Sequence, residues 1–262
     1  MKNKKLNVDL RKLIMEMVFR SSEGHIPSSF SIIDIIEHIY SKVLCYDKNQ
    51  LLANDRDIFV LSKGHGAAAL YAVLYKEGVL SSEDLLNYST RKGILGGHPD
   101  ATKVPGAEAS TGSLGHGFPM ATGMALGKKI KGYSGRVFAL LGDGECNEGT
   151  IWEAALVGAK RELGNLIAIV DLNGSAKQIL PVDPLADKWA AFGWETYEVN
   201  GHDAQDLERI FTQVTLSTSN RPKAIVAHTV KGKGVSFVEG HGVWHHKIPS
   251  KIEMEQMLEE LV

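Results

Sequence analysis

The sequence predicts an α/β fold in which a parallel β-sheet is flanked by helices on both faces. Residues 137–141 and 166–171 form two largely apolar runs, as expected for strands that are buried on both sides. The segment between them is about two dozen residues long, which is enough for a helical crossover between parallel strands. We expect residues 1–262 to form a single domain, because no repeat, low-complexity segment or Pro/Ser-rich linker divides them.

Hydrophobic spacing and turn residues predict the other elements in order. Before the central unit we expect amphipathic helices over residues 8–19 and 32–44, a short buried strand over 57–61 and an alanine-rich helix over 67–75. Ser81 and Asp84 have the spacing of a capping box at the start of another helix. Residues 92–117 are rich in Gly, Pro and Ser, and a loop of that length is usually functional. After the central unit we expect a helix over 184–192, a strand over 196–199, a helix over 204–216, a strand over 223–230 and a closing helix over 253–261. This alternation favours a sheet wrapped by helices.

The composition is ordinary for a globular protein. Of the 262 residues 44% are hydrophobic and 23% are charged, and the formal net charge of −2 gives no electrostatic preference for nucleic acid or an anionic membrane. No run approaches the ~18 apolar residues of a membrane span, and the basic start is not followed by the apolar core of a signal peptide. Cys45 and Cys146 lie far apart and lack metal-ligand spacing, which indicates a reducing compartment. We therefore expect a cytoplasmic protein with no nucleic-acid or membrane partner.

Polar residues follow both central strands. Gly142-Asp143-Gly144 comes after the first strand and Asn173 after the second, and the carboxyl ends of parallel strands form the edge where ligands bind. The Asp143 carboxylate, the Asn173 amide oxygen and a backbone carbonyl of the loop after Asn173 are hard donors that suit magnesium, which usually keeps phosphate oxygens as further ligands. The two glycines let the backbone approach a phosphate, and the following helix-like segment offers amide donors. The pattern predicts a divalent cation that holds a diphosphate.

These residues and several other segments resemble the transketolase family. Gly142-Asp143-Gly144 followed thirty residues later by Asn173 is similar to the thiamine diphosphate motif, and the run GDGECNEGTIWEAALVGAKRELGNLIAIVDLN is similar to transketolase throughout. The resemblance extends through Gly24-His25, LSKGHGAAALY, the GHP at 97–99, STGSLGHG, PLADKWAAFGW and the region of His245. It covers the amino-terminal, diphosphate-binding part of those enzymes.

The resemblance implies an activity and its cofactors. It implies a thiamine diphosphate-binding fold with magnesium, or calcium or manganese in its place, and a transferase that moves a two-carbon ketol unit from a ketose, free or phosphorylated, to an aldose or related acceptor. The cofactor supplies the nucleophilic carbon and the electron sink. The implied cofactor-binding residues are His65, Gly112, Ser113, Leu114, Gly142, Asp143, Gly144, Glu145 and Asn173. The implied metal ligands are Asp143, Asn173 and Ser175.

Four histidines in loops stand out from the others. The resemblance implies that His65 contacts the diphosphate, whereas His25, His98 and His245 line the substrate channel, stabilise oxyanions and move protons. The segment Trp244-His245-His246-Lys247 carries a second histidine where the family commonly has glycine, so either ring can be the one that enters the site. We expect the remaining residues of this kind, His38, His202, His228 and His241, to be ordinary surface or core histidines.

The resemblance also implies a partner chain. In the family the glutamate that generates the ylide comes from the pyrimidine-binding domain of the other protomer, and this sequence ends at Val262, before any such domain. We therefore expect the amino-terminal component of a split transketolase, which is inactive alone and forms a heterotetramer with a carboxy-terminal subunit. The resemblance places Glu148 at the subunit interface, where it couples two active sites. Acidic residues such as Glu148 and Glu153 also suit a helix amino terminus without any function.

Two departures from the family pattern lie near the predicted cofactor. Only the ten residues GSAKQILPVD separate Asn173 from Pro184, and His116 replaces a common glutamine. Cys146 is expected to be a small packing residue, although its place near a helix start favours a lowered pKa. Two alternatives remain: a component of a thiamine-dependent 2-oxo acid dehydrogenase, which would not be expected to show the histidine loops, and a non-catalytic regulatory subunit. Sugar specificity is not predicted.

Overall fold

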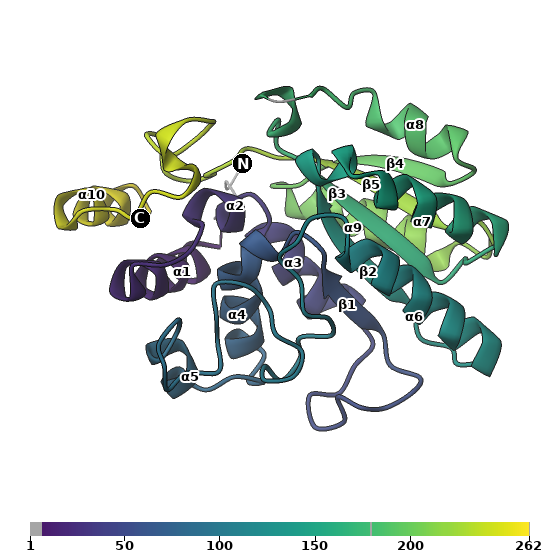
Figure 1. Cartoon of the computed structure of the whole chain (residues 1–262), viewed down its shortest axis with the longest axis horizontal. Helices are drawn as coiled ribbons and strands as arrows, with labels where there is room; N and C mark the ends of the chain where they lie inside the picture. The colour runs from purple at the N-terminus through teal and green to yellow at the C-terminus, as the bar shows by residue number, and fades with distance from the viewer. Residues whose placement is uncertain (1–6, 179, 262) are drawn as a thin grey trace.

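A fully parallel five-stranded sheet lies at the centre of the computed structural model, which describes residues 7–178 and 180–261 (Figure 1). Within these residues the strands are β1 (Ile58–Leu61), β2 (Val137–Gly142), β3 (Leu166–Leu172), β4 (Glu195–Asn200) and β5 (Lys223–His228). Their order in the sheet is β1-β2-β3-β5-β4, and every neighbouring pair is parallel. The predicted fold class is confirmed.

Helices cover both faces of the sheet. One face packs on α1 (Val8–Ser21), α3 (Ile33–His38), α4 (Ala67–Lys76) and α9 (Ala204–Leu216), and the other on α6 (Gly117–Lys131), α7 (Gly149–Lys160) and α8 (Leu185–Ala191). Alternate residues of each strand point to opposite faces of the sheet. Phe138 and Leu140 pack in the core on the first face, and Val137 and Ala139 pack in the core on the second. A strand that is apolar on both sides reads as one continuous run, which is why β2 and β3 were predictable.

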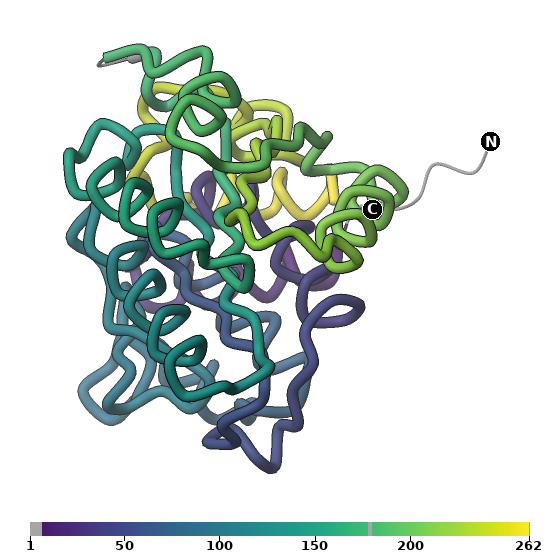
Figure 2. Tube along the Cα trace, turned by 90° about the vertical axis from the view of Figure 1, so that its right-hand side faces the viewer, coloured from purple at the N-terminus to yellow at the C-terminus, as the bar shows by residue number. Residues whose placement is uncertain are grey.

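The last helix of the described residues packs beside the first. The C-terminal segment, yellow in Figures 1 and 2, runs past the purple N-terminal helices, and α10 (Lys251–Glu260) packs against α1. The helix starts two residues earlier than predicted, because Ser250 caps it in a capping box with Glu253. None of the helices within the described ranges is long and apolar enough to cross a bilayer.

Most predicted elements are present, and the differences have local causes. Helix α9 begins and ends at the predicted residues, and the capping box of Ser81 and Asp84 opens α5 (Ser82–Leu86). The prediction of one helix over residues 32–44 was wrong, because α3 gives way to a π-helical turn at Ile39–Val43. Strand β5 ends two residues early, since the chain leaves the sheet after His228. Helices α2 (Ile26–Phe30) and α6 were not predicted.

Candidate functional site

The residues of the central motif line a pocket of about 230 Å³ at the carboxyl ends of β2 and β3. In the sheet Gly142 is level with Asp171, so the segments that follow the two strands lie next to each other. The pocket is lined by Ser28, Lys63, His65, Leu114, Gly142, Asp143, Gly144, Glu145, Asn173, Ser175, Lys231 and His245. Nine of these twelve were predicted as site residues, and the other three are Ser28, Lys63 and Lys231.

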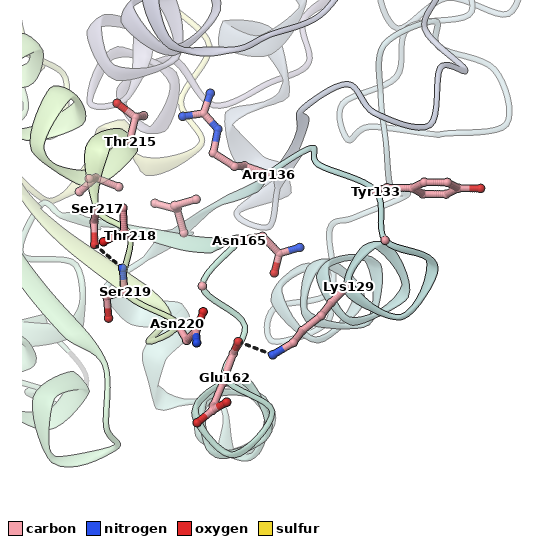
Figure 3. Close-up of a pocket in the computed structure, with 14 residues that line it drawn as sticks. Lys129, Tyr133, Arg136, Glu162, Asn165, Thr215, Ser217, Thr218, Ser219 and Asn220 are labelled. Atoms are coloured by element: carbon pink, nitrogen blue, oxygen red, sulfur yellow. Dashed lines mark hydrogen bonds between the residues drawn. The ribbon is translucent and has the colours of Figure 1, made fainter.

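A larger hollow of about 460 Å³ lies at the opposite, amino-terminal edge of the sheet (Figure 3). Arg136 and Asn165, which precede β2 and β3, contribute to its wall. The ammonium group of Lys129 is bonded to the backbone carbonyls of Arg161 and Glu162, both at 2.8 Å. No motif residue lines this hollow. We therefore take the smaller pocket as the candidate site.

Asp143 is buried at the end of β2 and already has two backbone partners. Its Oδ1 accepts a hydrogen bond from Gly144 N at 2.8 Å, and its Oδ2 accepts one from Ala176 N at 3.2 Å. Burial raises the pKa of this carboxyl group and Asp171 adds to the effect, whereas the backbone hydrogen bonds and Lys63 oppose it. Each carboxylate oxygen has a second lone pair, so the group can still accept a cation. A cation would also favour its ionised form.

Asn173 is held in a fixed orientation by its neighbours. Its Nδ2 donates to Asp171 Oδ2 at 2.8 Å, and its Oδ1 accepts from Ser175 N at 2.9 Å. With the amide nitrogen occupied by Asp171, the oxygen faces the segment that also carries Ser175. In residues 7–178 and 180–261 no three His, Cys, Asp or Glu side chains form a metal site. A cation at this edge would depend on mixed carboxylate, amide and backbone oxygens, which is a donor set that suits magnesium.

Two buried lysines bring positive charge to the pocket, and neither was predicted from the sequence. Lys63 Nζ lies 2.5 Å from Asp171 Oδ2, so its charge is balanced. Lys231 Nζ donates to Ser175 Oγ at 3.2 Å and lies 2.9 Å from His245 Nδ1, and among the described residues it forms no ion pair with a carboxylate. Burial lowers the pKa of Lys231, and Lys63 lowers it further against the opposing effect of the acidic groups. An unbalanced cation in a pocket favours an anionic ligand.

The positions of Lys63 and Lys231 in the sequence could have identified them as site residues. Lys63 lies directly before Gly64-His65-Gly66, at the carboxyl end of β1. Lys231 lies in a Lys-Gly-Lys-Gly turn three residues after β5. Both therefore lie close after a parallel strand, as Asp143 and Asn173 do, and a systematic scan of strand ends would have found them.

The loop histidines converge around His25. The ring centroid of His25 lies 4.9 Å from that of His65, 6.3 Å from that of His98 and 5.6 Å from that of His245. His246 is closer still, at 4.6 Å, and its Nε2 lies 3.6 Å from Glu23 Oε1. His245 reaches the pocket and Lys231, while His246 faces His25 from the more exposed side, so the structure brings both rings to the cluster.

The centre of this cluster is adapted to neutral imidazoles. Burial, helped by the surrounding histidines, lowers the pKa of His25 to about 3. Burial and then His98 and Lys63 lower the pKa of His65 to about 4, and burial also lowers the pKa of His245. The buried Nδ1 of His25 has no hydrogen-bond partner in the described part of the chain. An unsatisfied buried nitrogen is costly, so it indicates a place for a polar ligand atom.

Glycines let the loop at residues 112–114 approach the pocket. A Cβ on Gly64 would lie 2.7 Å from Gly112 N, and one on Gly112, whose φ is +151°, would lie 3.0 Å from the His98 ring. Leu114 lines the pocket, whereas Ser113 is exposed.

Glu145 is buried beneath this loop. It accepts hydrogen bonds from Ser62 Oγ at 2.6 Å and from the backbone of Gly115 and Gly142 at 3.0 and 3.3 Å. Burial raises its pKa. Glu145 therefore ties the loop to the end of β2.

The remaining predicted positions lie at the margin of the site. Glu148 is exposed at the N-cap of α7, beyond the 3-10 turn Gly144–Asn147. His116 is the exposed N-cap residue of α6 and contacts Leu114 O through Nδ1 at 3.0 Å. The expectation of a lowered pKa at Cys146 was wrong, because the thiol is fully buried and burial raises its pKa. In the short loop after Asn173, residue 179 lies outside the described residues.

The arrangement suits a diphosphate with a divalent cation. Asp143 and Asn173 offer hard oxygens at one edge, Lys63 and Lys231 offer positive charge beside them, and closely packed glycines shape the wall. The orphaned nitrogen of His25 lies in the neighbouring histidine cluster. The geometry thus combines an anion site with a group of imidazoles that can donate or accept protons.

Several known proteins match this chain over almost its whole length. The family described as transketolase, thiamine diphosphate binding domain, matches residues 2–260. The chain is 40% identical to one of the subunits of apulose-4-phosphate transketolase from Actinobacillus succinogenes, over 98% of this chain and 95% of that one. It is 38% identical to 6-deoxy-6-sulfo-D-fructose transketolase subunit SqwG of a Clostridium strain, over 90% of this chain and 88% of that one.

Longer transketolases match over a smaller share of their own length. Human transketolase is 36% identical across 96% of this chain, which spans 41% of the human protein. Transketolase from Leishmania mexicana superposes with a TM-score of 0.89 at 26% identity, over 97% of this chain and 40% of that one. The family predicted from the sequence is confirmed. The chain belongs to the transketolase family, in which it corresponds to the thiamine diphosphate-binding domain.

Proposed function

We propose that residues 1–262 form one domain that holds the diphosphate of thiamine diphosphate through a divalent cation and, with a separate subunit, transfers a two-carbon ketol unit between sugars. The observation that carries the proposal is the meeting of Asp143 and Asn173 at one sheet edge, beside the unbalanced charge of Lys231. The close relatives of similar length are named as subunits of transketolases, which supports a two-chain enzyme. Free cysteines and the ordinary charge support a cytoplasmic location.

The chain's own residues would bind the cofactor at three places. Asp143, Asn173 and the carbonyl of Ser175 would hold magnesium, or calcium or manganese. Lys231 and Lys63 would neutralise the diphosphate, His65 would donate a hydrogen bond to it, and Gly142, Gly144 and Glu145 would shape that wall. Gly112, Ser113 and Leu114 would meet the rest of the cofactor, which supplies the nucleophilic carbon and electron sink when bound. The partner subunit would supply the pyrimidine-binding domain and the activating glutamate.

The histidine cluster would act on the sugar. With a pKa of about 3, His25 is neutral at physiological pH and can donate a hydrogen bond to a developing alkoxide without first losing a proton. The pKa of His65, about 4, makes that ring neutral as well, so that it can donate a hydrogen bond to the diphosphate. His98 and His245 would orient hydroxyl groups beside them, and His246 with Glu23 would add a polar contact at the exposed side. Two relatives are named for a sugar phosphate and a sulfosugar, which supports an anionic sugar as substrate class.

The exposed face of α6 and α7 supports assembly as a heterotetramer. Met120 on α6 and Leu156 and Val157 on α7 are 37%, 56% and 44% exposed, although all three are apolar. A Cβ on Gly123 or Gly149 would meet no atom within 4 Å, so this face has room for a closely packed helix. Glu148 lies at the start of α7, and we propose that two copies of the chain meet here, with Glu148 in the contact.

Calorimetry tests the proposal directly. Thiamine diphosphate with magnesium is titrated into the chain with its partner, for the natural chain, for D143N and for D187N, which changes an exposed aspartate on α8. Loss of the anionic ligand at 143 should weaken metal-dependent binding about 10- to 100-fold, as expected for a charge-assisted contact, while D187N should bind normally. Ketol transfer should follow the same order and need both chains. Binding without turnover by the pair would favour a regulatory role for this chain, and full turnover by the isolated chain would refute the split enzyme.

A further inference from the structure

Lys231 belongs to a loop, residues 229–234, whose backbone is held by hydrogen bonds on both sides of the lysine. Val230 N donates to His202 Nε2 at 2.9 Å, and Gly232 N donates to Pro27 O at 3.0 Å. Arg11 Nε donates to Lys233 O at 2.8 Å, and Thr229 Oγ1 donates to Asp171 Oδ1. The path of the loop is therefore fixed by groups outside it.

The contact to Val230 is the end of a buried polar chain. His202 Nδ1 lies 2.8 Å from Asp34 Oδ2, and Arg11 binds the same carboxylate through Nη1 at 2.9 Å and Nη2 at 2.7 Å. Because Nε2 of His202 accepts a hydrogen bond from the backbone, the ring hydrogen must be on Nδ1 and points at Asp34. Burial acts to raise the pKa of Asp34, but hydrogen bonds from Arg11 and His202 outweigh it and hold the pKa below its usual range. The side chains of Arg11, Asp34 and His202 are 0%, 8% and 9% exposed.

We propose that His202 is a positioning residue for the anion site, which it serves by holding the loop that presents Lys231. His202 does not line the pocket, so it can influence a ligand there only through other groups. A lysine is flexible, and ordering such a side chain at the moment of binding weakens affinity about threefold to tenfold. A loop fixed in advance removes part of that cost. The inference rests on the proposed function, because the ligand of Lys231 is taken to be the diphosphate.

The test measures dissociation constants of magnesium pyrophosphate and of thiamine diphosphate with magnesium, by calorimetry, for the chain with its partner. H202N keeps an amide donor within reach of Asp34 but has no atom at the Nε2 position, so it frees Val230 without stripping the buried carboxylate. H202Q can place its carbonyl near the Nε2 position and retains the acceptor. H228N is the matched control, because His228 is exposed at the end of β5 and its ring binds Glu198 rather than the loop.

The expected affinities of the variants show whether His202 acts through Lys231. H202N should weaken both ligands about threefold to tenfold, and H202Q and H228N should bind as the natural chain does. In a K231M background H202N should cause no further loss, because the group that it positions is gone. Urea unfolding of every variant checks that the fold is retained.

Two results would overturn the inference. One is unchanged affinity in H202N, and the other is the same loss of affinity in H202N whether or not Lys231 is present. If H202N fails to fold, H202Q is compared with the double variant H202Q/V230P, in which proline removes the backbone donor of residue 230. The double variant then takes the place of H202N, with the same expected loss of affinity and the same two results against the inference. A natural chain that binds neither ligand would remove the proposed function and this inference together, whereas normal binding without dependence on His202 would remove this inference alone.

Discussion

A lysine ammonium buried without a carboxylate partner costs folding free energy, and Lys231 is such a group within the described residues. Its side chain has a hydroxyl and an imidazole as neighbours, and burial lowers its pKa. Lys63, by contrast, is paired with Asp171. The charge at 231 is therefore better explained by binding than by stability.

The K231M variant should distinguish a role of Lys231 in binding from a role in stability. Removing a buried unpaired charge and keeping a similar volume should raise the free energy of unfolding of the ligand-free chain by about 1 to 3 kcal/mol at pH 7. The affinity for thiamine diphosphate should fall about tenfold or more. Urea unfolding and calorimetry measure the two effects, with K42M, at an exposed lysine after α3, as the control. A less stable K231M chain would show that the lysine is structural.

His25 gives the stability a pH dependence of known sign. Its folded pKa of about 3 lies below the 6.5 of an ordinary histidine, so between those values the unfolded chain binds more protons. The free energy of unfolding should fall as the pH drops through this window. In H25N the slope between pH 6 and 4.5 should be smaller by about 1 kcal/mol per pH unit. Urea unfolding at several pH values checks this, and an unchanged slope in H25N would contradict the prediction.

At the scale of the elements, the close approach of η2 (Gly64–Gly66) to the loop at 112–114 shapes the site. In G64A the new Cβ would lie 2.7 Å from Gly112 N and 2.9 Å from Gly112 Cα, which are backbone atoms and cannot turn away. The variant should lose about 1 to 3 kcal/mol of unfolding free energy and bind thiamine diphosphate more weakly, since His65 and Leu114 must separate.

The matched control for this element is G123A on α6. A Cβ there meets nothing within 4 Å, and alanine is a better helix former, so the isolated chain should gain up to about 1 kcal/mol. Thermal unfolding of both variants measures the contrast. Equal stability of G64A and the natural chain would mean that the two loops can separate freely.

The elements also show which features were predictable from sequence. β2, β3 and the pair Asp143 and Asn173 were predictable, because buried parallel strands are apolar throughout and their ends mark the ligand edge. Helix α6 was missed because glycines at 117, 123 and 127 hide its apolar spacing.

The rest of the site was harder to predict, because it is assembled by tertiary structure. Lys231 enters it from a turn after β5, a strand that the sheet order places beside β3. Periodicity in the sequence contains no information about that neighbour. Spacing also left open whether His245 or His246 enters the site, and the structure brings both rings to the cluster around His25.

For the whole molecule, the apolar face of α6 and α7 predicts how copies assemble. L156E would place a charge at a 56% exposed leucine on this face. If two copies meet there, the complex with the partner subunit should fall from two of each chain to one of each, and Glu148 should lose its coupling role. Sedimentation velocity measures the mass. L216E, at a 74% exposed leucine on α9, should leave the assembly intact. A natural complex that already contains one of each chain would contradict the proposal.

The unbalanced ammonium group of Lys231 has a practical consequence at the bench. A cavity with surplus positive charge attracts any small oxyanion in solution, so phosphate or sulfate in a buffer will compete with the cofactor. Titrations in such buffers will report affinities that are too low and will shrink the differences between variants. Preparations kept in chloride with a zwitterionic buffer should reveal the intrinsic strength of the site.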